Sequence, residues 1–151
     1  MLPEIVVLAC NWDGWSSVEN ASSRGLHYPA SVRVVRVSCL SRLHAGLILK
    51  AFEFGADGVM LLGCEEGKCR FGADGEHTIG EYRKSQAILE MLGLCPGRLT
   101  LVRLPAFSGH DFVAELTQFL ADIDRMPIPR RTRAPWLRPG RDVRTSMTSP
   151  L

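Results

Sequence analysis

The sequence predicts an α/β fold in which a parallel sheet of about four short strands is flanked by helices. Four β-type apolar runs alternate along the chain with four segments of helical periodicity. Repeated alternation of this kind is typical of parallel strands joined by crossover helices. The 151 residues suffice for one domain, and the composition of 46% hydrophobic and 23% charged residues is that of an ordinary globular protein.

The four strand-like runs are short and rich in branched aliphatic residues. The first and third are almost continuously apolar, which is typical of strands covered on both faces. The second alternates valine with arginine, so one of its faces is expected to meet solvent. The predicted strands are residues 5–10, 32–39, 59–64 and 99–104.

Helical periodicity fills the intervals between these runs, and local signals mark the helix ends. Ser16 with Glu19 predicts a capping box at a first helix that runs to about Arg24. Ser108 with Asp111 predicts the start of the last helix in the same way. The other two predicted helices and their glycine stops are residues 43–54 with Gly55 and residues 79–92 with Gly93.

Positive charge is concentrated in the C-terminal segment 126–151. This segment holds six of the 18 basic residues, one of the 16 acidic residues and five of the nine prolines. Such a composition cannot bury a core, so we predict an α/β domain over residues 1–125 and a disordered basic tail over residues 126–151. The tail is expected to act either as a docking arm for an acidic partner or as a solubilising extension.

The sequence predicts a cytoplasmic location. The first apolar run is too short for a secretory signal, and no run approaches the length of a membrane span. Five cysteines in a reducing compartment favour metal or redox chemistry over structural disulfides.

Four of the five cysteines are predicted to meet at one edge of the sheet. Cys10, Cys39 and Cys64 each end a predicted strand. The carboxyl ends of parallel strands share the edge at which open α/β folds bind their ligands. Cys69 follows Cys64 at C-x4-C spacing in the next loop, whereas Cys95 belongs to the opposite edge and is expected to take no part.

Converging thiolates bind either zinc or an iron–sulfur cluster. The C-x2-C pairs of structural zinc sites do not occur, and C-x4-C with two distant cysteines is closer to the spacing for a two-iron cluster. A zinc-stabilised interaction module, a thiol enzyme using Cys10 or Cys64, and simple burial of the cysteines remain alternatives. The stretch from Cys64 to Arg70 matches the C-x5-R phosphate loop in form, but Glu65 and Glu66 within it would repel phosphate.

Two tryptophans, Trp12 and Trp15, follow the first cysteine. They could shield a cluster from water or anchor a partner, and they could equally roof the edge of the sheet. The sequence leaves both interpretations open.

Four motifs are distinctive when taken together: CNW at 10–12, YPxxVRxxRVxC at 28–39, AFxxGADGVxxxGCxxGxC at 51–69 and LxxLGLxPxRL at 89–99. With these motifs the chain resembles the iron–sulfur (delta) subunit family of methyl-viologen-reducing hydrogenase. The resemblance extends from about Glu4 to Ile123.

The resemblance implies a doubly wound, flavodoxin- or Rossmann-like fold and one two-iron two-sulfur cluster. The cluster-binding cysteines of the family carry over onto Cys10, Cys39, Cys64 and Cys69. Many members have a further cysteine where this chain has Asp13, whose carboxylate is expected to lie near the cluster without ligating it.

The resemblance also implies a role in electron transfer, with no substrate site in this chain itself. The implied partners are a hydrogenase or another dehydrogenase and a heterodisulfide-reductase-like flavoprotein, within one larger redox complex. No nucleic-acid partner is expected.

Overall fold

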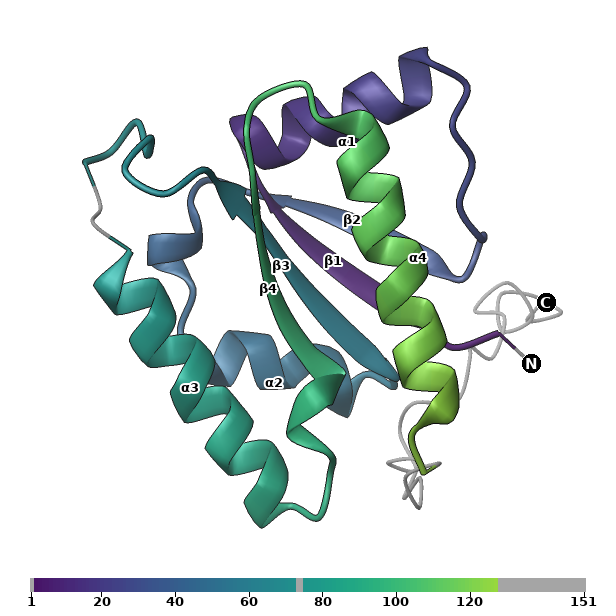
Figure 1. The fold of residues 1–151 in the computed structure, drawn as a ribbon. Helices are drawn as coiled ribbons and strands as arrows, with labels where there is room; N and C mark the ends of the chain where they lie inside the picture. Colours follow the sequence, from purple (N-terminus) through teal and green to yellow (C-terminus); the bar gives the residue numbers. More distant parts are fainter. Residues whose placement is uncertain (1, 73–74, 128–151) are drawn as a thin grey trace, which may run out of the picture.

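The computed structural model describes residues 2–72 and 75–127, which form the expected α/β fold (Figure 1). The four strands make one parallel sheet in the order β2-β1-β3-β4, which is the start of the doubly wound flavodoxin-like order. The strands are β1 Ile5–Cys10, β2 Val32–Val37, β3 Gly58–Cys64 and β4 Leu99–Leu104. The helices are α1 Asp13–Ser23, α2 Ala45–Glu53, α3 Glu76–Met91 and α4 Gly109–Arg125, with 3-10 helices η1 Leu40–Arg42 and η2 Pro96–Arg98.

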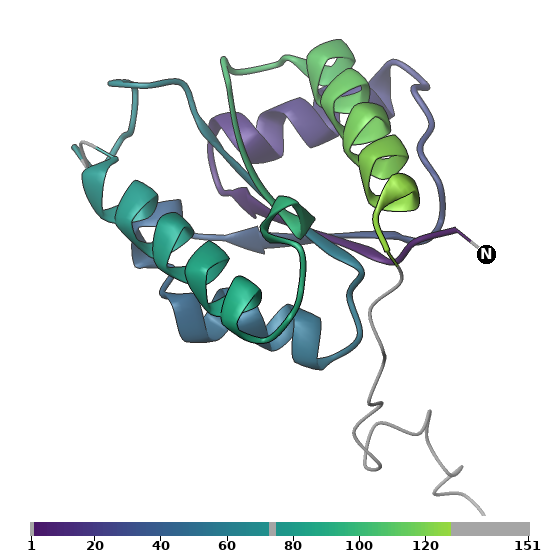
Figure 2. The same cartoon turned by 60° about the horizontal axis from the view of Figure 1, so that its bottom comes forward.

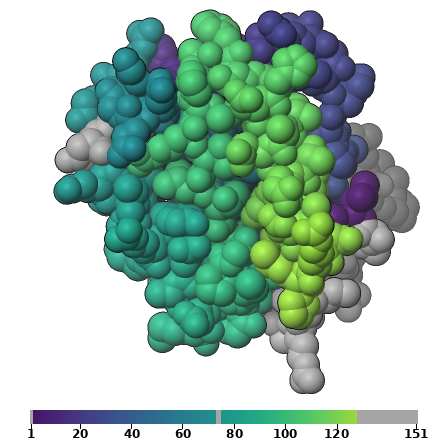
Figure 3. Space-filling view, viewed as in Figure 1, coloured from purple at the N-terminus to yellow at the C-terminus, as the bar shows by residue number. Residues whose placement is uncertain are grey.

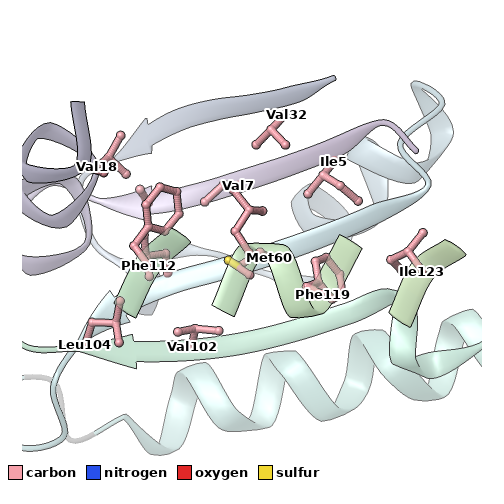
Figure 4. Packing of buried hydrophobic residues seen from close by; sticks show 14 residues of the cluster. Ile5, Val7, Val18, Val32, Met60, Val102, Leu104, Phe112, Phe119 and Ile123 are labelled. Carbon is pink, nitrogen blue, oxygen red and sulfur yellow. The ribbon is translucent and has the colours of Figure 1, made fainter. Parts of the chain in front are cut away.

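The sheet lies between two layers of helices, with α1 and α4 on one face and α2 and α3 on the other (Figures 1 and 2). Figure 3 shows α4 lying across the front of the molecule. On this face Phe112 and Phe119 pack over Val7 and Met60 (Figure 4). Cys10 points to the opposite face, where it joins the apolar cluster covered by α2 and α3. The first cysteine is thus built into the core.

Strand β2 ends at Val37, two residues before the predicted end at Cys39. Cys39 instead precedes η1 in extended conformation, and Leu40 directly after it is 6% exposed. Because Leu40 is buried in the core under α2 and α3, the chain turns inward here and the strand cannot continue. The sequence pattern missed this because Ser38 and Cys39 are as compatible with a strand as with a turn.

Helix α1 begins at Asp13, so the predicted capping box at Ser16 is wrong. Ser16 lies inside the first turn and its Oγ donates to the carbonyl oxygen of Asp13 at 2.9 Å. Glu19 accepts a hydrogen bond from Nε1 of Trp15 at 2.8 Å instead of reaching a backbone N–H. The helix therefore starts almost directly after Cys10, which places its first N–H groups beside the cysteines.

Helix α4 starts after Ser108 as predicted, but the Ser108 side chain does not cap it. Three successive backbone N–H groups, those of residues 107–109, donate to side chains of α1 at 3.1–3.2 Å. The acceptors are Ser16 Oγ, Ser17 Oγ and Asn20 Oδ1. The N-terminus of α4 is therefore satisfied by another helix, and α1 and α4 are held together at this end.

The described part of the chain ends at Pro127, which still contacts the domain. Arg98, at 3% exposure, donates to the carbonyl oxygens of Asp57 and Pro127 at 2.7 Å each. The predicted basic tail, apart from Met126 and Pro127, lies outside the described residues. Within residues 2–72 and 75–127, no helix reaches the length and apolarity of a membrane span.

The close approach of α4 to α1 depends on Gly109, so we expect Gly109→Ala to destabilise the fold. A Cβ at position 109 would lie 2.5 Å from the backbone nitrogen of Ala21 and 2.8 Å from its Cα. Backbone atoms cannot move aside cheaply, and the expected loss is about 1–3 kcal/mol in the free energy of unfolding. Urea unfolding followed by circular dichroism measures it.

Gly80 provides the matched control because a Cβ at this position of α3 meets nothing within 4 Å. Gly80→Ala should stabilise the protein by about 0.5–1 kcal/mol, as alanine is the better helix former. A Gly109→Ala protein as stable as the wild type would show that α1 and α4 do not need this contact.

Candidate metal centre at the carboxyl edge of the sheet

The structure brings the four predicted cysteines together as two pairs. Cys10 and Cys64 end the neighbouring strands β1 and β3, and their Sγ atoms are 3.5 Å apart. Cys39, just beyond β2, and Cys69, in the loop after β3, have Sγ atoms 3.7 Å apart. This edge is at the upper left in Figure 1. It includes the β1/β3 switch point, at which folds with this strand order bind their ligands.

All four thiols line one pocket of about 430 Å³, measured with its open mouth. Each pair combines a buried thiol with a partly exposed one: Cys10 and Cys39 are 2% and 7% exposed, whereas Cys64 and Cys69 lie nearer the mouth. Cys95 is exposed at the opposite end of the sheet, before η2 and β4. The sequence-based expectation that Cys95 stands apart from the other four is confirmed.

Hydrogen-bond donors surround the sulfur atoms. The backbone N–H of Gly14 donates to Cys10 Sγ at 3.2 Å, and that of Asp13 donates to Cys64. Both belong to the first turn of α1, whose N-terminus carries a positive partial charge. These contacts favour negatively charged sulfur, and they depend on α1 beginning as early as it does.

Burial raises the pKa of the Cys64 thiol to about 12. The neighbouring Cys10 and the Asp13 carboxylate make smaller contributions to this rise, while the backbone N–H of Asp13 acts in the opposite direction. A bound metal ion reverses this preference, because its positive charge stabilises the thiolate. The influence of Asp13 on Cys64 also places the carboxylate near the thiols.

The geometry distinguishes between kinds of metal centre. Within residues 2–72 and 75–127, no three cysteine, histidine or acidic side chains are grouped tightly enough to hold one ion. A tetrahedral metal with bonds of about 2.3 Å to sulfur separates two thiolates by about 3.8 Å. Each of the two pairs is close to this separation.

The two tryptophans have different environments. Trp12 packs against the cluster that contains Cys10 and Cys64, and the Arg70 guanidinium lies 4.2 Å from its ring centre. The exposed ring of Phe71 meets Trp12 edge-on at 6.5 Å. Trp15 instead packs on the α1 and α4 side. Trp12 therefore packs on the face of the sheet that carries Cys10, and Trp15 packs on the other face.

The structure places at the site several residues that no motif in the sequence singled out as site residues. Arg103 and Gly63 line the pocket, and Ser41 Oγ lies 3.0 Å from Cys39 Sγ. A Cβ at position 63 would lie 2.6 Å from Leu40 Cδ1, so glycine keeps this side of the pocket compact. Of these residues only Gly63 could have been found from the sequence, because it precedes Cys64 within the motif at 51–69.

Fold and site together define a small doubly wound α/β protein whose switch point is lined by cysteine thiols. Residues 5–127 match the family described as methyl-viologen-reducing hydrogenase, delta subunit. The chain belongs to this family, as its motifs suggested.

Curated relatives point in the same direction. An F420-non-reducing hydrogenase iron-sulfur subunit from Archaeoglobus profundus is 33% identical over 124 residues, covering 82% of this chain and 90% of the relative. The vhc iron-sulfur subunit of the same type of hydrogenase from Methanococcus voltae is 32% identical, covering 82% and 86%. One subunit of the ferredoxin:CoB-CoM heterodisulfide reductase of Methanosarcina mazei is 27% identical over 82% of this chain. That match covers 16% of the reductase polypeptide, so the similarity concerns one segment of a much longer protein.

The pairing of the thiols can be tested without any metal. Mild oxidation of the chelator-treated protein at alkaline pH should join Cys10 to Cys64 and Cys39 to Cys69, because these sulfur atoms already lie 3.5 Å and 3.7 Å apart. Peptide mapping by mass spectrometry identifies the links, and Cys95 should remain free as the internal control. A dominant link between Cys10 and Cys39 would contradict this arrangement.

Proposed function

We propose that this chain is an electron-transfer subunit that holds one two-iron two-sulfur cluster through Cys10, Cys39, Cys64 and Cys69. The observation that carries the proposal is the arrangement of the four thiols as two close pairs in one pocket. Relatives that cover most of this chain are named iron-sulfur subunits, which supports the choice of cofactor.

The donor set fits a centre with two metal ions better than one with a single ion. Cys10 with Cys64 would hold one iron, and Cys39 with Cys69 the other. A single zinc ion would need all four sulfur atoms at the tetrahedral separation from one another, whereas a two-iron centre needs it only within each pair. Cys64 and Cys69 belong to different pairs, and the four residues between them give the chain the length to reach from one pair to the other.

When bound, the cluster supplies one-electron redox chemistry. The four cysteines of the chain would hold the iron, the N–H groups of Asp13 and Gly14 act on Cys64 and Cys10, and Trp12 packs on the same side of the sheet. Hydrogen bonds to ligating sulfur atoms and restricted solvent access are two of the factors that set a cluster's reduction potential. We assign the chain no substrate site of its own.

We infer that the chain passes electrons between a donor module, such as a hydrogenase, and a flavin- and iron–sulfur-containing protein of the heterodisulfide reductase type. The Methanosarcina mazei reductase polypeptide contains a segment similar to this chain. This fusion supports the proposal that this chain, as a separate polypeptide, associates with a protein of the heterodisulfide reductase type. A cytoplasmic location suits the proposal, because a reducing compartment keeps four free thiols available for iron.

The alternative is a zinc-stabilised interaction module, and one set of variants separates the two. We expect Cys39→Ala or Cys69→Ala to abolish or severely degrade the cluster, because each removes one thiolate of the same pair. Iron and acid-labile sulfide assays and the visible absorbance spectrum are the measurements. Cys95→Ala is the control and should retain both metal content and spectrum.

Two results would overturn the proposal. A colourless wild-type protein with one zinc ion per chain would establish the alternative. A Cys39→Ala or Cys69→Ala protein with full iron content and an unaltered spectrum would show that the ligands lie elsewhere.

Asp13 provides a second test, because its carboxylate raises the pKa of Cys64 and we propose that it lies near the cluster without ligating it. Asp13→Asn should keep the cluster and raise its reduction potential, since removal of a nearby negative charge favours the reduced form. The expected change is at most about tenfold in the equilibrium constant, which is about 59 mV for one electron. Loss of iron from this variant would mean that Asp13 is a ligand after all.

A further inference from the structure

A guanidinium group shares the pocket with the four thiols. Arg103 lies on β4 opposite Gly63 in the β3–β4 register, one residue before Cys64. It lines the same pocket as the cysteines, and its side chain is only 21% exposed. The positive charge of Arg103 is therefore partly shielded from water beside the four cysteines.

In the described part of the chain, Arg103 forms a weak ion pair with a carboxylate. Glu66 Oε1 lies 3.8 Å from Nη1 of Arg103, and the Glu66 side chain is 82% exposed. A long contact to a solvated carboxylate contributes little.

The other face of the guanidinium is pressed against the start of α3. A Cβ at Gly75 would lie 2.6 Å from Nη2 of Arg103, and Gly75 has a φ of +84°. Gly75 is the N-cap of α3, and both Gly75 and Thr78 of the first turn line the pocket. A cation at a helix N-terminus is electrostatically unfavourable, because the helix dipole is positive there.

Three sources of positive potential thus converge on one pocket: Arg103, the N-terminus of α3 and the N-terminus of α1. Carboxylates lie there too: Glu65 and Glu66 line the pocket, and Asp13 and Glu76 lie in the first turns of α1 and α3. A two-iron two-sulfur cluster with four thiolate ligands would add two negative charges when oxidised and three when reduced, beside the Arg103 side chain.

We propose that the positive charge of Arg103 raises the reduction potential of the cluster and that the negative charge of Glu66 partly offsets this effect. The inference rests on the proposed function. Reduction brings one electron from the donor module onto the cluster, and no bond of Arg103 or Glu66 forms or breaks. The added negative charge is attracted by the guanidinium, so Arg103 favours the reduced form, and Glu66 has the opposite effect.

The test compares the two members of the pair in the full-length, cluster-containing protein. Arg103→Gln should lower the midpoint potential by the equivalent of about tenfold in the equilibrium constant for reduction, which is about 59 mV for one electron. Glu66→Gln should raise it. Arg103→Lys keeps the charge and should remain near the wild-type value. Redox titration followed by visible absorbance measures the potential, with iron and sulfide assayed in every variant.

The opposite signs separate an electrostatic role from a structural one. If the ion pair only fixed the loop between Cys64 and Cys69, both glutamine variants would loosen that loop and change the potential in the same direction. Arg125 and Asp122 form a comparable exposed pair at the far end of α4, at 3.5 Å. Arg125→Gln and Asp122→Asn are therefore the matched controls and should leave the potential unchanged.

The outcomes distinguish this inference from the proposed function. A wild-type chain without iron and sulfide would overturn both. A cluster-containing wild type whose potential is unaltered in Arg103→Gln and Glu66→Gln, or altered in the same direction by both, would overturn only the role of Arg103. Arg103→Gln could lose its iron, and its potential could then not be measured. In that case Glu66→Gln decides the question, with Arg103→Lys as the charge-conserving control. An unchanged potential in Glu66→Gln would refute the proposed electrostatic role of the two residues.

Discussion

The site depends on the abrupt transition from β1 into α1. Cys10 ends the strand and the helix begins at Asp13, so the first N–H groups of the helix lie beside the sulfur atoms of two strand ends. Gly14 makes this possible, because a Cβ there would lie 2.5 Å from the carbonyl oxygen of Leu62. A helix that began one turn later would leave both thiols without these donors. The position of α1 therefore fixes both the geometry and the electrostatics of the pocket.

The helices that border this edge are joined by contacts between their ends. Side chains of α1 accept the N–H groups at the start of α4. On the other face, Glu81 of α3 accepts the N–H of Ala45 at the start of α2, at 2.7 Å. Lys84 beside Glu81, together with this N–H group, lowers the pKa of the Glu81 carboxyl group. Each helix pair is thus held near its N-terminal end, on the side of the thiols.

The convergence of the cysteines was predictable from the sequence, but their pairing was not. Cys10, Cys39 and Cys64 follow strand-like runs, and all parallel strands end at one edge. Which thiols meet depends on the strand order β2-β1-β3, which no local pattern encodes. Arg103 was missed for the same reason: within an apolar run it attracts no notice until β4 is known to lie beside β3. The capping of α4 by α1 was likewise hidden, because its partners lie about 90 residues apart in the chain.

The separation of the paired cysteines along the chain has a consequence for biogenesis. Cys10 and Cys64 are 54 positions apart, and Cys39 and Cys69 are 30 apart. The first pair comes within reach only when β1 and β3 lie side by side, and closing so long a loop before the strands pair is entropically costly. A newly made chain would therefore have to form its sheet before it could accept iron. Under the proposed function, a cluster would therefore be inserted into the edge of a folded sheet rather than bound by an extended polypeptide.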